Sequence, residues 1–347
     1  MFTVPGLLYC QLVAVICSTF TEDNAKWFHL TPFRWVWRSA ITGCEMWLYD
    51  ELYTSDAWNR AHDKLQKQSC SNGCKLECVI AGLMFWPNAT HLTQFGDASA
   101  WPIYLFFGNQ SKYTCACLSS ACHPIAFMPT LPPSIAEFIS KFTKKKNYDD
   151  IIAHCKQELF HGVWRVLLDE EFVEANKDGI VIRCYDGVCW QVFPCIFTYA
   201  ADYPEKVLLA TIRDKGNFPC PWCLIAKEDF SCLGLQSDAS RRFTKICQYF
   251  LDQILAAHNA IYRLGRPIKG VIPEHYLKVF SLVPTFNSFA DILGPLGLDV
   301  YSIVMVDLLH EFKLGIFKSV FRHLLRLLYM IHPDTVIQLN EQYEVFI

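Results

Sequence analysis

The sequence has 347 residues, of which 52% are hydrophobic and 19% are charged, and this excludes an intrinsically disordered chain. The formal net charge of −3 excludes a uniformly basic nucleic-acid-binding protein. Any contact with DNA would therefore depend on local basic clusters, of which the sequence offers Lys141 with lysines 144–146, and Arg241 with Arg242.

The first twenty residues carry no charge, yet they lack the basic start and the small-residue cleavage site of a signal peptide. They are also marginal as a membrane span, which needs about 20 predominantly apolar residues. We expect a buried strand or an erroneous gene start here, and no contact with a membrane. Residues 1–75 as a whole are predicted to form a helical and irregular N-terminal lead-in, with one helix near 51–68.

Five apolar segments predict the strands of a mixed α/β core in residues 76–215, at 78–86, 101–108, 180–188, 191–200 and 206–214. The first of them is continuously apolar, which is typical of a strand buried on both faces. Helices are expected at 134–142, 148–169 and 240–264. The segment 301–331 is apolar nearly all round, so we predict a buried helix in a C-terminal region of residues 301–347.

The chain contains 17 cysteines, which suit either a secreted disulfide protein or an intracellular protein that buries most of its thiols. The chain is longer than most disulfide scaffolds, and several cysteines lie in apolar surroundings, so the intracellular interpretation is favoured. Cys220 and Cys223 form a Cys-x-x-Cys motif in the predicted region 216–300. Such a motif is half of a tetrahedral zinc site, and a redox dithiol or an unliganded pair are the alternatives. The remaining zinc ligands are not evident; candidates are Cys117, Cys122, His123, Cys232, Cys247 and His258.

Two groups of acidic residues are candidates for a metal site. In a helix, residues three and four apart share a face, so Asp307, His310 and Glu311 would project together and could bind a divalent cation. The alternative is a helix end that turns its polar face to solvent. Asp202 and Glu205 follow the predicted strand 191–200, where metal ligands occur in α/β enzymes and where ordinary loop residues occur as well.

Several long blocks of this sequence resemble the shared blocks of Plavaka-type transposon proteins of basidiomycete fungi, which are allied to the Kyakuja–Dileera–Zisupton superfamily. The blocks occur in the same order, and the resemblance runs from about residue 48 to near the C-terminus. They comprise residues 82–96, 101–113, 155–172, 196–225, 281–297 and 306–329.

The resemblance implies an α/β fold of the ribonuclease-H-like type, with a mixed sheet, flanking helices and a cysteine-containing, zinc-knuckle-like insertion. It also implies a nuclear DNA transposase that cleaves DNA and transfers strands with two divalent ions, Mg²⁺ or Mn²⁺, held by acidic residues. On this interpretation Asp202, Glu311 and Asp307 are catalytic residues, His310 is a metal ligand, and Cys220 and Cys223 bind structural zinc.

The sequence departs from the family pattern at two places. The family block that usually reads Ser-Asp-Ala-Thr is here Pro87-Asn88-Ala89-Thr90, so Asn88 takes the place of the first acidic ligand. Where the family tends to read His-Glu-Phe-Glu, this chain has Lys313 in place of the second glutamate. If the family's final acidic ligand is the first glutamate, it survives as Glu311; if it is the second, Lys313 replaces it with the opposite charge. We therefore expect a degenerate or partial copy with impaired catalysis; the alternative is a non-enzymatic scaffold that binds DNA or protein.

Overall fold

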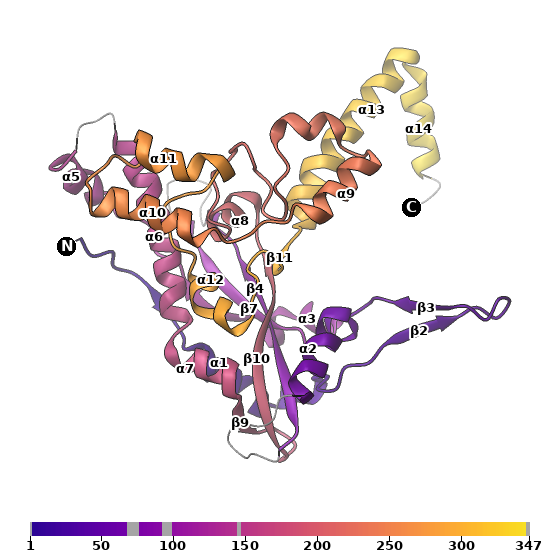
Figure 1. The fold of residues 1–347 in the computed structure, drawn as a ribbon. Coiled ribbons are helices and arrows are strands. Elements are labelled where there is room, and N and C mark those ends of the chain that lie inside the picture. Colours follow the sequence, from indigo (N-terminus) through magenta and orange to yellow (C-terminus); the bar gives the residue numbers. More distant parts are fainter. Residues whose placement is uncertain (1, 68–75, 92–98, 144–146, 345–347) are drawn as a thin grey trace.

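The computed structural model describes residues 2–67, 76–91, 99–143 and 147–344. A mixed sheet of seven strands runs through the protein, and helices lie on both of its faces (Figure 1). This confirms the mixed α/β class predicted from the sequence. In spatial order the strands are β1 (Leu8–Tyr9), β8 (His123–Phe127), β7 (Pro102–Phe107), β4 (Cys78–Pro87), β10 (Cys189–Ala200) and β11 (Val304–Met305), and β9 (Ile180–Arg183) also pairs with β10.

The strand directions divide the sheet into two parts. In chain order β4, β7 and β8 form an antiparallel meander. On its other side β4 is parallel to β10, and β10 is parallel to β11. Because β4, β10 and β11 are parallel neighbours, their carboxyl ends lie at the same edge of the sheet.

Strand β4 is buried on both faces, as its continuous apolar run predicts. Val79, Leu83 and Phe85 face the main core, whereas Ile80 faces a second, smaller core on the opposite side. Successive side chains of a strand point to opposite faces, so covering both faces requires apolar residues at nearly every position.

Helices α6 (Tyr148–Leu167) and α12 (Ser288–Leu293) cover the main core. The ring of Trp164 lies 5.0 Å from that of Phe85 and 4.8 Å from that of Phe289, measured between centroids. With α5 (Ser134–Ser140), α6 confirms the helices predicted at 134–142 and 148–169. Helix α7 (Glu170–Asp178) follows and packs on the same core through Phe172.

The opposite face of the sheet is covered by α2 (Asp56–Lys67), which confirms the helix expected near 51–68. Its fully buried Trp58 stacks on Phe197 with centroids 4.8 Å apart and planes at 9°. The indole also lies directly over Gly82 of β4. A Cβ atom at residue 82 would be 2.1 Å from the indole ring, so this position requires glycine.

The N-terminal segment differs from its prediction as a buried strand. Only the short β1 is extended, and α1 (Leu12–Thr21) follows it. Leu12, Ile16 and Phe20 are spaced by four residues and pack together into the main core, which is the reason the segment is helical.

Farther along, β2 (Trp35–Arg38) and β3 (Glu45–Leu48) form a hairpin that extends away from the sheet in Figure 1. The other minor elements described in this half are the 3-10 helices η1 (Asp23–Trp27) and η2 (Leu52–Thr54), the strands β5 (Thr90–His91) and β6 (Ser99–Ala100), and the helices α3 (Lys112–Cys115) and α4 (Leu118–Ala121).

The strand predicted at 206–214 is also wrong, because α8 (Tyr203–Leu209) occupies the first four residues of that segment and a turn follows. Asp202 accepts a hydrogen bond from the backbone of the first turn, and Pro204 lies in that turn; both features start a helix. The helix predicted at 240–264 is divided into α9 (Gln236–Thr244) and α10 (Leu251–Tyr262), and α11 (Val271–Leu277) follows.

The prediction of a buried helix at 301–331 is wrong, because the segment begins with buried residues that are not helical, Tyr301, Ile303 and Val304, and the helices that follow are not buried. After β11 the chain forms a π-helix, η7 (Leu308–Phe317), then α13 (Lys318–Ile331) and α14 (Asp334–Glu344). No described side chain of η7 or α13 is buried. Figure 1 shows the reason: α13 and α14 project beyond the sheet and its covering helices.

One edge of β10 is shared by two short strands. β9 pairs with Cys189–Val192, and β11 pairs with Tyr199 and Ala200. Between these ladders lies Pro194, which has no N–H to donate. The Pro194 carbonyl oxygen accepts a hydrogen bond of 2.6 Å from Asn176 Nδ2 of α7.

Candidate functional site

The candidate site lies where β4, β10 and β11 end. Asn88 follows β4, Asp202 lies two residues beyond the end of β10, and Asp307 lies two residues beyond the end of β11. Since the three strands are parallel neighbours, these positions lie along one edge of the sheet. Glu311 lies in the first turn of η7, directly after Asp307 and His310.

Asp202 and Asn88 are both exposed to solvent. Asp202 caps α8, because its Oδ1 accepts a hydrogen bond of 3.1 Å from the backbone N–H of Glu205. The backbone N–H of Asn88 donates to Pro102 O at 3.1 Å, which continues the pairing of β4 with β7. Asp202 therefore has a structural role in addition to any functional role.

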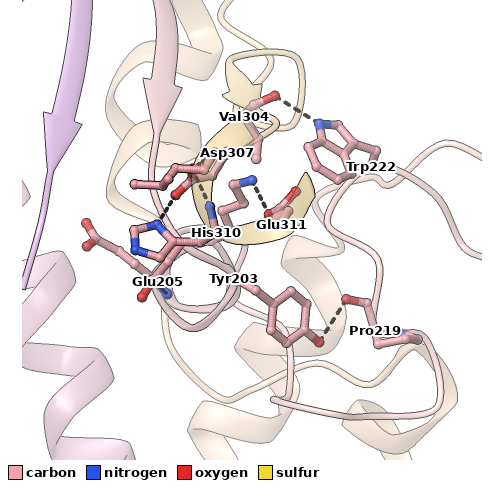
Figure 2. A network of polar contacts seen from close by, with 11 residues as sticks. Tyr203, Glu205, Pro219, Trp222, Val304, Asp307, His310 and Glu311 are labelled. Carbon is pink, nitrogen blue, oxygen red and sulfur yellow. Dashed lines mark hydrogen bonds and ion pairs between the residues drawn. The ribbon is translucent and has the colours of Figure 1, made fainter. Parts of the chain in front are cut away.

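Asp307 caps the π-helix and pairs with the next candidate residue. Its Oδ1 accepts hydrogen bonds from the backbone N–H groups of Leu309 and His310, and its Oδ2 lies 2.5 Å from His310 Nδ1 (Figure 2). Partial burial opposes ionisation of Asp307, but the hydrogen bonds from His310 and Leu309 outweigh it and lower the pKa of this carboxyl. Asp307 is therefore an ionised carboxylate that is already bound to an imidazole.

The sequence predicted that Glu311 would project together with Asp307 and His310. Instead, Glu311 pairs with Lys206 of α8 (Figure 2). Lys206 is fully buried, and its Nζ also lies 5.1 Å from the ring centroid of Trp222. Trp222 in turn donates a 2.9 Å hydrogen bond to Val304 O of β11. The ion pair thus joins the helix that follows β10 to the helix that follows β11.

Glu205 is a second acidic residue at this edge, which the sequence offered beside Asp202 but which was not assigned as a ligand. It is buried and accepts hydrogen bonds from Tyr199 Oη at 2.7 Å and Trp101 Nε1 at 2.9 Å. Burial raises the pKa of Glu205 to about 7, although both hydrogen bonds favour the ionised form. The signal was present: Glu205 and Lys206 are adjacent charges in an otherwise apolar helix, and buried charges need partners.

The donors at this edge are of the right type for Mg²⁺, but their arrangement does not fit a two-metal centre as it stands. Within residues 2–67, 76–91, 99–143 and 147–344, no group of three or more His, Cys, Asp or Glu side chains is placed to hold a metal ion. The Asp307 carboxylate is bound to His310, and that of Glu311 to Lys206. Asn88 contributes only a neutral amide.

The Cys-x-x-Cys motif lies close to a third cysteine. A backbone bridge between Cys223 and Ile246 brings Cys247 beside the motif, and Cys247 Sγ lies 3.4 Å from Cys220 O. Arg242 Nη1 lies 3.5 Å from Cys223 Sγ. Of the candidate fourth ligands, His258 packs against Tyr262 and Phe286.

Cys220 is expected to react as a thiolate near neutral pH. A hydrogen bond from Cys223, backbone hydrogen bonds and nearby Arg242 together lower its pKa well below that of an ordinary thiol, against the effect of burial. Alkylation of Cys220 by iodoacetamide in EDTA should therefore show a midpoint at lower pH than an ordinary thiol, which mass spectrometry of the peptide can follow. Cys223→Ala should move the midpoint to higher pH, because it removes the hydrogen bond that contributes most to the lowered pKa of Cys220. Cys247→Ala is the control. If it moves the midpoint of Cys220 upward as much as Cys223→Ala does, the hydrogen bond from Cys223 is not the cause of the lowered pKa.

A model of the Plavaka transposase family matches residues 6–326 of the chain. The matched range includes β4, β10, β11 and the candidate residues at their ends. None of the curated proteins matches the chain. Within the part of the chain that the structure describes, no helix has both the length and the apolar character needed to cross a membrane.

Proposed function

Because the chain belongs to the Plavaka transposase family, we propose that it acts on DNA at the sheet edge where β4, β10 and β11 end. The observation that carries this location is the parallel arrangement of the three strands, which brings Asn88, Asp202 and Asp307 to one edge. The meander β4–β7–β8, followed by two strands parallel to β4, supports a ribonuclease-H-like core. A nuclear location follows from DNA as the proposed substrate.

We propose further that this copy is catalytically impaired. A divalent metal site needs negative charge, and Asn88 offers an oxygen without a charge. Lys206 already neutralises Glu311, and Lys313 adds a positive charge nearby in η7. Mg²⁺ or Mn²⁺ is accordingly the proposed cofactor of a site repaired by Asn88→Asp, in which the added carboxylate would join Asp202 and the carboxylates of η7.

The substitution Asn88→Asp is expected to create or raise metal-dependent cleavage of DNA. The test compares nicking of a supercoiled plasmid in Mn²⁺ by the unchanged chain, by Asn88→Asp and by Asn88→Ala. Cleavage by Asn88→Asp should stop when Asp202→Ala is added, while Asn88→Ala should behave as the unchanged chain does. If the unchanged chain cleaves strongly and Asp202→Ala leaves that activity intact, the location is wrong.

A non-enzymatic DNA-binding scaffold is the second candidate function. The observation that favours it is the ion pair of Lys206 with Glu311, since a carboxylate already neutralised by the protein attracts a metal ion weakly. This candidate predicts salt-dependent binding of DNA in EDTA and no cleavage by Asn88→Asp.

Structural zinc at Cys220 and Cys223 is also proposed, on the type and spacing of the two thiols. Cys247 lies near enough to the motif to be a third ligand after a local adjustment. Zinc content measured on protein purified without chelator tests this proposal. Substitution of both Cys220 and Cys223 by serine should remove the metal, and retention of a full equivalent would contradict it.

A further inference from the structure

The C-terminal arm, η7 with α13, is strongly basic in an otherwise slightly acidic chain. Residues 308–331 contain four lysine or arginine residues and one acidic residue, Glu311, which is paired with Lys206. Lys318, Arg322 and Arg326 follow one another at intervals of four residues in α13, so they form a stripe along one side of the helix. All three side chains are exposed, and the stripe extends over about 12 Å of helix axis.

This stripe differs from the basic clusters that the sequence suggested. Arg241 is paired with Asp229 at 3.0 Å, and Arg242 with Asp238 at 2.8 Å. Lysines 144–146 lie outside the described residues. Among the ion pairs of the described residues, none involves Lys318, Arg322 or Arg326. The stripe therefore presents its positive charge to solvent.

Exposed aromatic rings lie beside the start of the stripe. An open groove is lined by Phe312, Lys313, Leu314, Phe317, Lys318 and Phe321. The exposed fractions of Phe312, Phe317 and Phe321 are 51%, 52% and 40%. The rings of Phe317 and Phe321 are 5.6 Å apart with planes at only 9°, so they present parallel faces. Lysines that flank exposed, parallel aromatic rings suit a phosphate backbone with stacked bases.

The groove begins one residue after Glu311, at the candidate site. The two carboxylates that would repel a phosphate there have cationic or imidazole partners, since Glu311 pairs with Lys206 and Asp307 with His310. A strand that occupies the groove would therefore lie next to the sheet edge without facing an unpaired carboxylate of η7.

We propose that η7 and α13 bind single-stranded DNA, with phosphates along Lys318, Arg322 and Arg326 and bases stacked on Phe317 and Phe321. This inference rests on the proposed function, because it supplies the DNA segment that the candidate site would act on. Single-stranded DNA fits better than duplex DNA, whose bases are already stacked and cannot use the aromatic groove. An anionic membrane could meet the charges but would require no pair of parallel rings.

The test measures binding of the full chain to a labelled oligothymidine by fluorescence anisotropy in EDTA, over a series of salt concentrations. Neutralising the stripe with K318Q/R322Q/R326Q should make the slope of log affinity against log salt shallower by about 2, since each phosphate contact on a single strand contributes about 0.7. F317A/F321A should weaken binding roughly tenfold or more with the slope unchanged, because stacking releases no counterions.

Three matched controls accompany these variants. K318R/R322K/R326K keeps every charge and should bind as the unchanged chain does. K67Q/K177Q/R183Q removes the same charge from exposed positions in α2, α7 and β9, and should leave the slope nearly unchanged. Binding of a duplex should be insensitive to F317A/F321A. Circular dichroism checks that each variant is folded.

The outcomes separate this inference from the proposed function. If the unchanged chain binds neither single-stranded nor duplex DNA at low salt, the proposed function fails. If it binds DNA and both arm variants bind equally well, only this inference fails. The inference is also overturned if F317A/F321A turns a dimer into a monomer, which would make the groove an interface between copies. The inference is overturned as well if K318Q/R322Q/R326Q loses binding to phosphatidylserine vesicles but binds DNA as the unchanged chain does.

Discussion

Glu311→Ala is expected to lower the free energy of unfolding by about 3 kcal/mol or more, because it leaves a buried charge without a counter-ion. The Nζ atom of Lys206 has no solvent contact to replace the carboxylate, since the lysine side chain is 0% exposed. The nearby Trp222 ring offers only a weaker attraction. Urea denaturation followed by circular dichroism measures the change.

Two further variants make this result specific. Lys206→Met combined with Glu311→Leu removes both charges, and we expect it to be about as stable as the unchanged chain, because well-packed apolar residues often replace a buried pair without loss. Glu45→Ala breaks the exposed pair with Arg38 and should cost less than about 1 kcal/mol. If Glu311→Ala lowers the free energy of unfolding by no more than Glu45→Ala does, the buried charge of Lys206 does not need Glu311 as its counter-ion.

At pH 8, Glu205→Gln is expected to stabilise the protein by up to about 3 kcal/mol, from a difference of roughly two pKa units or more between the folded and unfolded carboxyl. The folded pKa of about 7 lies above the ordinary value of 4.5. Between these values the unfolded chain ionises while the folded protein keeps the proton. The stability that Glu205 contributes in acid is thus lost as the pH rises through this window.

Glutamine keeps one acceptor oxygen, which can serve Trp101, and its amide NH2 can donate to the Tyr199 hydroxyl, but it cannot ionise, so the variant should lose this part of the pH dependence. Unfolding free energies at pH 5 and pH 8 should differ less in Glu205→Gln than in the unchanged chain. The same substitution at Glu137, an exposed residue of α5, controls for removal of a carboxylate. Equal pH dependence with and without Glu205 would contradict the prediction.

The sequence predicted the central strands well because their signal is local. β4 and β10 are long and apolar, so their residues alone reveal them. β1 and β11 have two residues each, and such short strands leave no alternation to detect. β8 was missed as well, since Pro124 interrupts its apolar run. The apolar residues of 206–214 suggested a strand, but Asp202 and Pro204 just before them are typical of the start of a helix, and the segment begins as one.

The candidate site was predictable in position but not in its contacts. The ends of apolar strands mark Asn88 and Asp202, and the resemblance to the family marks Glu311. The partner of Glu311 is Lys206, which lies 105 residues earlier in the chain. No periodicity in the sequence reports such a pairing, because it depends on how β10 and β11 are placed side by side. The exposure of α13 was unpredictable for the same reason: an apolar helix face shows what a helix can cover, not whether a neighbour is there.

The paired edge of β10 has a consequence for the behaviour of the protein in solution. An unpaired stretch of strand invites another molecule to add a strand of its own, which is a common start of aggregation. In the stretch between β9 and β11, Pro194 lacks the donor that such an incoming strand would need, and Asn176 already occupies its acceptor. Edge-to-edge growth of the sheet is therefore blocked at the middle of its longest strand, and Asn176→Ala would reopen the acceptor to an incoming chain.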